Sequence, residues 1–219
     1  MYVMLIYNKG SDNGGDIVMQ TENIIISHHD RTIYGTYYKP DAEGHFPLVI
    51  FSHGYNGHQD DFAVSAKYFT DNGIGASQGG MVSALTAEER ASDIHALILL
   101  YPALCIADDW NARFPTAEDI PDSETLWGME LGRRFFESIR GFQIKEKIGQ
   151  FTGNVLLMHG SDDAVVNADY SVWASKQYPN ARLEIFQSEG HGFSNEGNRR
   201  MEAMALYFIH ECMNIRKPL

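Results

Sequence analysis

The pentapeptide Gly75-Ala76-Ser77-Gln78-Gly79 decides the fold, because its G-x-S-x-G pattern is typical of a tight turn between a strand and a helix. Such a turn holds a serine hydroxyl out of the backbone, and its glycines relieve crowding. Residues 74–76 predict a very short strand, and residues 78–91 predict a helix with one apolar face. The pattern arises by accident in roughly one chain of this length in ten to fifteen, so an ordinary small-residue turn is the alternative.

Buried strands are expected on both sides of this turn. Continuous apolar runs at residues 47–52, 96–101 and 155–159 predict strands that are covered on both faces. Residues 23–27 and 32–38 predict a hairpin, and residues 182–186 predict a last strand. Helices are expected at residues 60–72, 168–178 and 198–214. This alternation predicts an α/β fold with a doubly wound, mainly parallel sheet in one domain spanning residues 1–219.

Two segments depart from the alternation. Residues 1–7 predict a poorly anchored lead-in or a short edge strand. Residues 103–150 lack strand periodicity and contain two prolines and several large aromatic side chains, which predicts a small helical lid inserted into the domain.

Composition narrows the class of protein. A chain of 219 residues with 44% hydrophobic residues can bury a sizeable core and is not disordered. The formal net charge of −12, without a basic cluster, argues against a nucleic-acid partner. Cys105 and Cys212 lie far apart without C-x-x-C spacing, so we expect neither a disulfide nor a zinc site, and the cytoplasm is the default location. No apolar run approaches the length of a membrane span, so no membrane partner is expected.

Three side chains suited to nucleophilic catalysis follow predicted strand ends, where reactive groups of a parallel sheet collect. A serine hydroxyl such as that of Ser77 needs a base to accept its proton, and the base needs a carboxylate to orient it. His191, flanked by Gly190 and Gly192 in a predicted loop, is the candidate base, although an exposed loop histidine is the alternative in a chain with nine histidines. Asp163 is preferred over Asp162 as the carboxylate, because H-G-x-x-D-x-x-V is the usual spacing.

A reaction of this kind also needs two N–H donors for the oxyanion of its tetrahedral intermediate. Gln78 follows the serine and begins a helix, so its N–H is free and lies at the positive end of the helix dipole. The second donor is expected in the loop after residues 47–52, at Tyr55.

Together these motifs resemble the α/β-hydrolase superfamily and, more closely, the small bacterial cinnamoyl (feruloyl) esterases and related acyl esterases. The resemblance covers most of the chain from about residue 23. It rests on five stretches: His53-Gly54-Tyr55-Asn56-Gly57, Ser77-Gln78-Gly79-Gly80, Tyr101-Pro102, residues 159–166 and Glu189-Gly190-His191-Gly192-Phe193.

The resemblance implies hydrolysis of a small-molecule carboxylic ester by a triad of Ser77, Asp163 and His191, with oxyanion donors at Tyr55 and Gln78 and no cofactor. It also implies that residues 103–150 shape the pocket for the acyl group. The residues of this lid expected to meet a phenolic acyl group are Trp127, Phe136, Asp119 and Asp122. A serine peptidase, a thioesterase and an inactive hydrolase-like scaffold remain alternatives, because this fold serves many reactions.

The chain departs from these relatives just before the serine. They have a strand, a crossover helix and a second strand there, a block of about 35–45 residues at usual element lengths. This chain has only residues 73–76, which span at most about 13–14 Å when extended. We therefore expect a reduced sheet with a gap beside the first hairpin, a missing segment, or an exchange of elements within a homodimer.

Overall fold

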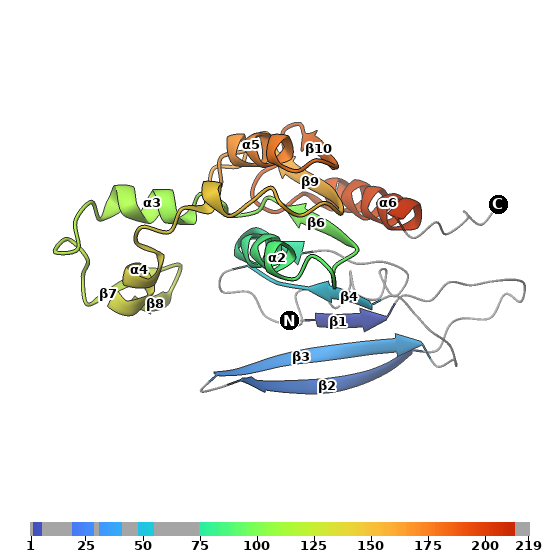
Figure 1. Cartoon of the computed structure of the whole chain (residues 1–219), viewed down its shortest axis with the longest axis horizontal. Coiled ribbons are helices and arrows are strands. Elements are labelled where there is room, and N and C mark those ends of the chain that lie inside the picture. Colours follow the sequence, from blue (N-terminus) through green and yellow to red (C-terminus); the bar gives the residue numbers. More distant parts are fainter. Residues whose placement is uncertain (1, 6–18, 29–30, 41–47, 55–74, 213–219) are drawn as a thin grey trace, which may run out of the picture.

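The computed structural model describes residues 2–5, 19–28, 31–40, 48–54 and 75–212 (Figure 1). The predicted helix at residues 60–72, together with Ile74 and Tyr55, lies outside the described residues. The strands of the first sheet, in the order β2-β3-β1-β4, are β2 (Met19–His28), β3 (Arg31–Pro40), β1 (Tyr2–Leu5) and β4 (Leu48–Phe51). The strands of the second, in the order β10-β9-β6-β5, are β10 (Ala181–Phe186), β9 (Asn154–Gly160), β6 (Ala96–Leu100) and β5 (Gly75–Ala76).

The first sheet confirms the hairpin and corrects the place of the first strand. β2 and β3 pair antiparallel from Met19 opposite Pro40 to His28 opposite Arg31. β1 is not an edge strand: it lies between β3, to which it is parallel, and β4, to which it is antiparallel. It thereby occupies the gap expected beside the hairpin and pairs backbone groups of both neighbours, which would cost free energy if they were buried without partners.

The second sheet is parallel throughout and confirms the predicted α/β fold class. β5 is only two residues long, and its register sets Gly75 opposite Leu99 and Ala76 opposite Leu100. It also lies beside β4, which brings the two sheets next to each other. A strand of two residues is therefore enough to deliver the chain to Ser77, where α2 (Ser77–Glu89) begins.

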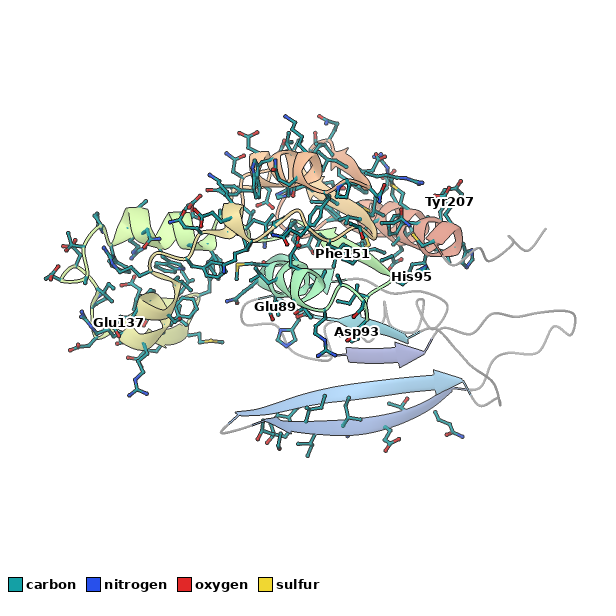
Figure 2. The ribbon with its side chains drawn as sticks, viewed as in Figure 1. Glu89, Asp93, His95, Glu137, Phe151 and Tyr207 are labelled. Carbon is teal, nitrogen blue, oxygen red and sulfur yellow. The ribbon has the colours of Figure 1, made fainter. Side chains whose placement is uncertain are left out.

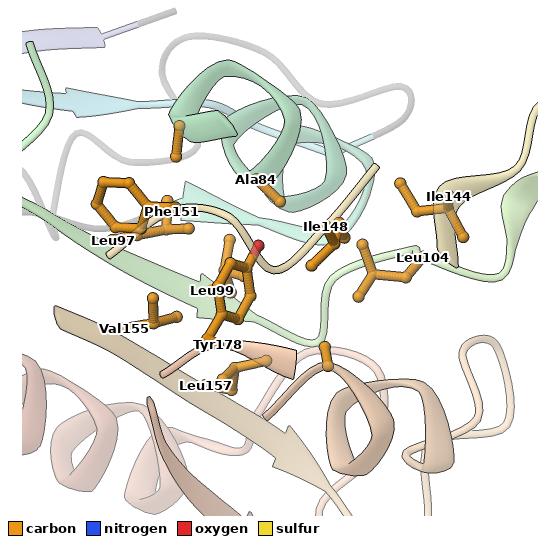
Figure 3. Close-up of a cluster of buried hydrophobic side chains, with 12 residues drawn as sticks. Ala84, Leu97, Leu99, Leu104, Ile144, Ile148, Phe151, Val155, Leu157 and Tyr178 are labelled. Carbon is orange, nitrogen blue, oxygen red and sulfur yellow. The ribbon is translucent and has the colours of Figure 1, made fainter. Parts of the chain in front are cut away.

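Alternate residues of the central strands face different helices, as expected for strands covered on both sides. On one face, Ile98 of β6 and Met158 of β9 pack against α6 (Asn195–Cys212). On the other, Leu99 and Leu157 belong to a cluster that includes side chains of α2 and of α5 (Asp169–Gln177), as Figure 3 shows for Ala84 of α2. This alternation explains why both strands are continuous apolar runs in the sequence.

Residues between β6 and β9 form a protruding unit (Figure 1), and Figure 2 shows Glu137 of this unit on the opposite side of the molecule from Tyr207 of α6. Its elements are α3 (Ile106–Arg113), β7 (Ser123–Leu126), β8 (Met129–Gly132), α4 (Arg133–Ile139) and the 3₁₀ helix η2 (Ile144–Glu146). The expectation of a segment without strands is wrong, because β7 and β8 form a hairpin. Its two-residue turn, Trp127-Gly128, has positive φ angles of 47° and 80°, as this kind of hairpin requires.

Both ends of the protruding unit are attached to α2. At the start, the N–H of Ala103 donates a hydrogen bond to the carbonyl of Ser77 at 3.0 Å. At the end, the Glu88 carboxylate accepts hydrogen bonds from the N–H groups of Gly149, Gln150 and Phe151 at 2.7–2.9 Å. The helix that begins at Ser77 thus fixes the entry and the return of this unit.

Candidate active site

Ser77 lies at a strained strand-to-helix turn. Its φ angle of +53° is in the left-handed region, which a non-glycine residue adopts at an energetic cost. Gly79 is buried two residues on, and a Cβ there would lie 2.2 Å from the carbonyl oxygen of Ser52. Only glycine lets the first turn of α2 approach the backbone that follows β4, and this explains the second glycine of the motif.

The structure brings His191 to Ser77. The Nε2 atom of His191 lies 2.9 Å from Ser77 Oγ, and its Nδ1 lies 2.8 Å from Asp163 Oδ2. Since Asp163 accepts from Nδ1–H, Nε2 is the acceptor for the serine hydroxyl. His191 sits in the loop between β10 and α6, so the three side chains come from three separate strand ends, as predicted.

Asp163, and not Asp162, faces His191. Its side chain is fully buried, and its Oδ1 accepts hydrogen bonds from the N–H groups of Val165 and Val166 at 2.9 and 2.8 Å. Burial raises the pKa of the Asp163 carboxyl, but the hydrogen bonds from Val166, His191 and Val165 outweigh it, and the pKa lies below its ordinary value. Asp162 is exposed and accepts a hydrogen bond from the Ser161 hydroxyl.

Packing holds the His191 loop in place. The ring of Tyr101 lies 4.8 Å from that of His191, and Tyr101 also contacts Phe193 edge to face. Burial, with a smaller contribution from Asp163, raises the pKa of Tyr101 to about 12, so its phenol stays neutral. A Cβ at Gly160, after the histidine of H-G-x-x-D, would lie 2.1 Å from the carbonyl oxygen of Glu189, so glycine is required where β9 meets this loop.

Of the two predicted oxyanion donors, only Gln78 lies within the residues that the structure describes. It is half-buried and is the second residue of α2, where backbone N–H groups have no partner within the helix. Tyr55 lies just beyond the last described residue of the preceding segment, Gly54, so its role stays a prediction.

The four residues expected to meet an acyl group lie in the protruding unit. Phe136 is 2% exposed inside an aromatic cluster in which its ring centroid lies 4.9 Å from that of Trp110 and 5.3 Å from that of Phe114. Trp127 is 62% exposed at the tip of the β7–β8 hairpin. Asp119 and Asp122 are exposed, and Asp119 Oδ2 accepts hydrogen bonds from the N–H and hydroxyl of Thr116. Their contact with a substrate stays a prediction.

One buried group beside the site was not among the residues predicted from the sequence. His159 is fully buried, and its Nε2 lies 3.1 Å from Asp163 Oδ2. In the sequence, His159 is the first residue of the H-G-x-x-D motif, and this motif was used only to prefer Asp163 over Asp162. Within the described part of the chain, no group of three or more metal-ligating side chains is placed to hold a metal ion. Among the same residues, no helix has the length and hydropathy needed to cross a membrane.

Solved structures share this architecture, whereas no family model and no curated protein matches the sequence. Est1E from Butyrivibrio proteoclasticus superposes with a TM-score of 0.67 and 21% identity over 76% of this chain and 88% of that one. Its structure with bound ferulic acid gives 0.61 and 22% over 82% and 78%. Mouse alpha/beta hydrolase domain-containing protein 10 gives 0.51 and 15% over 82% and 78%. The arrangement of strands, helices and strand-end loops is therefore that of the α/β-hydrolase fold.

Proposed function

We propose that the chain is a serine hydrolase that cleaves carboxylic esters. The observation that carries this proposal is the hydrogen-bonded series from Ser77 Oγ to His191 and from His191 to Asp163, with distances of 2.9 and 2.8 Å. Both distances lie within the reach that proton transfer requires, which favours an active enzyme over an inactive scaffold. The strained backbone at Ser77 supports the same conclusion.

The geometry accounts for each step of ester hydrolysis. Ser77 Oγ attacks the ester carbonyl carbon while its proton passes to His191 Nε2, and Asp163 stabilises the resulting imidazolium. The N–H of Gln78 stabilises the oxyanion at the start of α2. The C–O bond of the ester then breaks, and the leaving alcohol takes the proton from Nε2. A water molecule attacks the acyl-enzyme with His191 again as base, and the carboxylic acid and free Ser77 are regenerated.

Hydroxycinnamate esters are the substrate class to test first. The support is the likeness to Est1E, a structure of which contains ferulic acid, together with the motifs that resemble feruloyl esterases. In this proposal the protruding unit shapes the acyl pocket, with the exposed Trp127 as a candidate contact, whereas the buried Phe136 acts only through the aromatic cluster around it. The alternatives of a peptidase or thioesterase use the same series of groups and differ only in the leaving group.

The experiment compares wild type, Ser77→Ala and Ser83→Ala on 4-nitrophenyl acetate and ethyl ferulate. Ser83 lies on α2 as Ser77 does, so it controls for the loss of a hydroxyl from this helix. We expect turnover by wild type and Ser83→Ala and almost none by Ser77→Ala. Equal rates for wild type and Ser77→Ala would refute the proposal. Labelling of Ser77 by a fluorophosphonate without ester turnover would instead favour a peptidase or thioesterase.

A further inference from the structure

A second histidine contacts the carboxylate that orients His191. His159 Nε2 lies 3.1 Å from Asp163 Oδ2 and 3.0 Å from the carbonyl oxygen of Val166. On the other side of the ring, His159 Nδ1 lies 2.7 Å from the hydroxyl oxygen of Ser171 on α5. His159, Ser171 and the Asp163 side chain are all 0% exposed, so water does not compete for these contacts.

The surroundings of His159 select one tautomer. Its Nε2 faces two oxygen atoms that only accept hydrogen bonds, the Asp163 carboxylate and the Val166 carbonyl, so the proton belongs on Nε2. Its Nδ1 then accepts from the Ser171 hydroxyl, which can donate. The opposite tautomer would direct a nitrogen lone pair at a buried carboxylate. Burial also lowers the pKa of His159 below its ordinary value, which keeps the ring neutral.

Asp163 is consequently held on all sides. Two backbone N–H groups donate to its Oδ1 and His191 Nδ1–H donates to its Oδ2, while His159 Nε2, whose hydrogen bond is to the Val166 carbonyl, lies 3.1 Å from the same Oδ2. A carboxylate held in this way keeps His191 aligned with Ser77, and alignment matters because a displacement of about 1 Å can cost about a hundredfold in rate.

We propose that His159 is a positioning residue for the Asp163 carboxylate and that Ser171 fixes its tautomer. The resulting series, Ser171–His159–Asp163–His191–Ser77, connects α5 to the reacting hydroxyl. This inference rests on the proposed function of Ser77, Asp163 and His191. The competing explanation is a buried histidine that only stabilises the fold, and the experiment must separate the two.

Three variants test the proposal against a control for lost stability. His159→Met removes the donor at similar length, His159→Gln keeps an N–H near the position of Nε2, and Ser171→Ala leaves the ring in place without its partner. Val155→Ala is the control, because Val155 is fully buried on the same strand β9 and belongs to the cluster on the α2 face. Each protein is assayed with 4-nitrophenyl acetate across pH, with its folded fraction measured in parallel.

We expect His159→Met to lose about 10- to 100-fold in kcat with KM nearly unchanged, and Ser171→Ala to lose less. His159→Gln is expected to recover most of the loss. The acid limb of the kcat/KM profile should move in His159→Met, because the Asp163 carboxylate that accepts from His191 Nδ1 loses its contact with His159 Nε2. Tyr101 also faces Asp163 and is neutral throughout this range. The proposal fails if His159→Met and Ser171→Ala lose no more than Val155→Ala and the acid limb does not move.

A second measurement does not depend on turnover. Nitrogen-15 NMR of the imidazole rings in wild type should show His159 protonated on Nε2 and not on Nδ1, and Ser171→Ala should change this signal. Protonation on Nδ1 would overturn the inference. If wild type and Ser77→Ala hydrolyse the ester equally, the proposed function falls, and the NMR result still decides the arrangement of His159.

Discussion

Gly79→Ala tests whether the turn at Ser77 depends on close backbone contact. The added Cβ would lie 2.2 Å from the carbonyl oxygen of Ser52 and 2.5 Å from that of His53. Ordinary contact begins near 3.4 Å, so the start of α2 and the backbone after β4 must separate by about 1.2 Å. Both are backbone segments and cannot rotate out of the way as a side chain can. A shift of this size costs about a hundredfold in rate, and the overpacking costs about 1–3 kcal/mol of stability.

Gly80→Ala is the matched control for this experiment. Gly80 is the next residue of the same helix, and a Cβ there would lie 3.0 Å from the Pro102 side chain, which requires a shift of only a few tenths of an ångström. Both substitutions gain about the same helix propensity, roughly 1 kcal/mol. The assay is kcat/KM for 4-nitrophenyl acetate together with urea unfolding. If Gly79→Ala retains the kcat/KM of Gly80→Ala, the contact between α2 and Ser52 does not position the serine.

Three further substitutions or conditions probe other contacts. Asp163→Asn should lower kcat about 1,000- to 10,000-fold, because an amide cannot hold His191 in the required tautomer. Asp162→Asn changes an exposed carboxylate and should leave kcat unchanged, so similar losses for both variants would contradict the assignment. Glu88→Ala should lower the free energy of unfolding by about 2–3 kcal/mol in a urea titration, because three N–H groups lose a charged acceptor. Glu89 is exposed, and Glu89→Ala should change the free energy of unfolding by less than about 0.5 kcal/mol in the same titration. Stability should fall as the pH drops below about 6.5, because His159 takes up a proton there in the unfolded chain, while burial keeps its pKa lower in the folded protein. His159→Met should flatten this part of the pH–stability curve, and an unchanged slope would argue against a neutral buried ring.

The sequence predicted best those strands that are buried on both faces. β6 and β9 are unbroken apolar runs because both of their faces pack against helices, so their pattern needed no knowledge of partners. The β7–β8 hairpin was missed because Ser123, Glu124 and Thr125 carry little apolar signal, and the positive φ angle at Trp127 is visible only in the backbone. The position of β1 depends on pairing with strands more than 30 residues away, which local patterns do not encode.

In the candidate site, too, some residues could be predicted from local sequence patterns and others could not. Ser77, Asp163 and His191 stand in glycine-marked motifs at strand ends, and the structure brings all three together. The contribution of His159 depends on Ser171, which belongs to the following helix, so the sequence alone gave no reason to connect them. His159 is one of nine histidines in the chain, and only its burial and its distance from Asp163 distinguish it from the others.

The protruding unit enters at Ser77 and returns at Glu88, and three of its side chains, Leu104, Ile144 and Ile148, also belong to the buried cluster of Leu99 and Leu157. Its two attachment points lie on one rigid helix, eleven residues apart, or about 16 Å at the rise of an α-helix. A change at Leu104, Ile144 or Ile148 therefore disturbs the core of the sheet, whereas a change at the exposed turn of the β7–β8 hairpin leaves both attachment points in place. A graft of this unit from another hydrolase would accordingly have to match these buried side chains as well as the Glu88 carboxylate that receives its returning backbone.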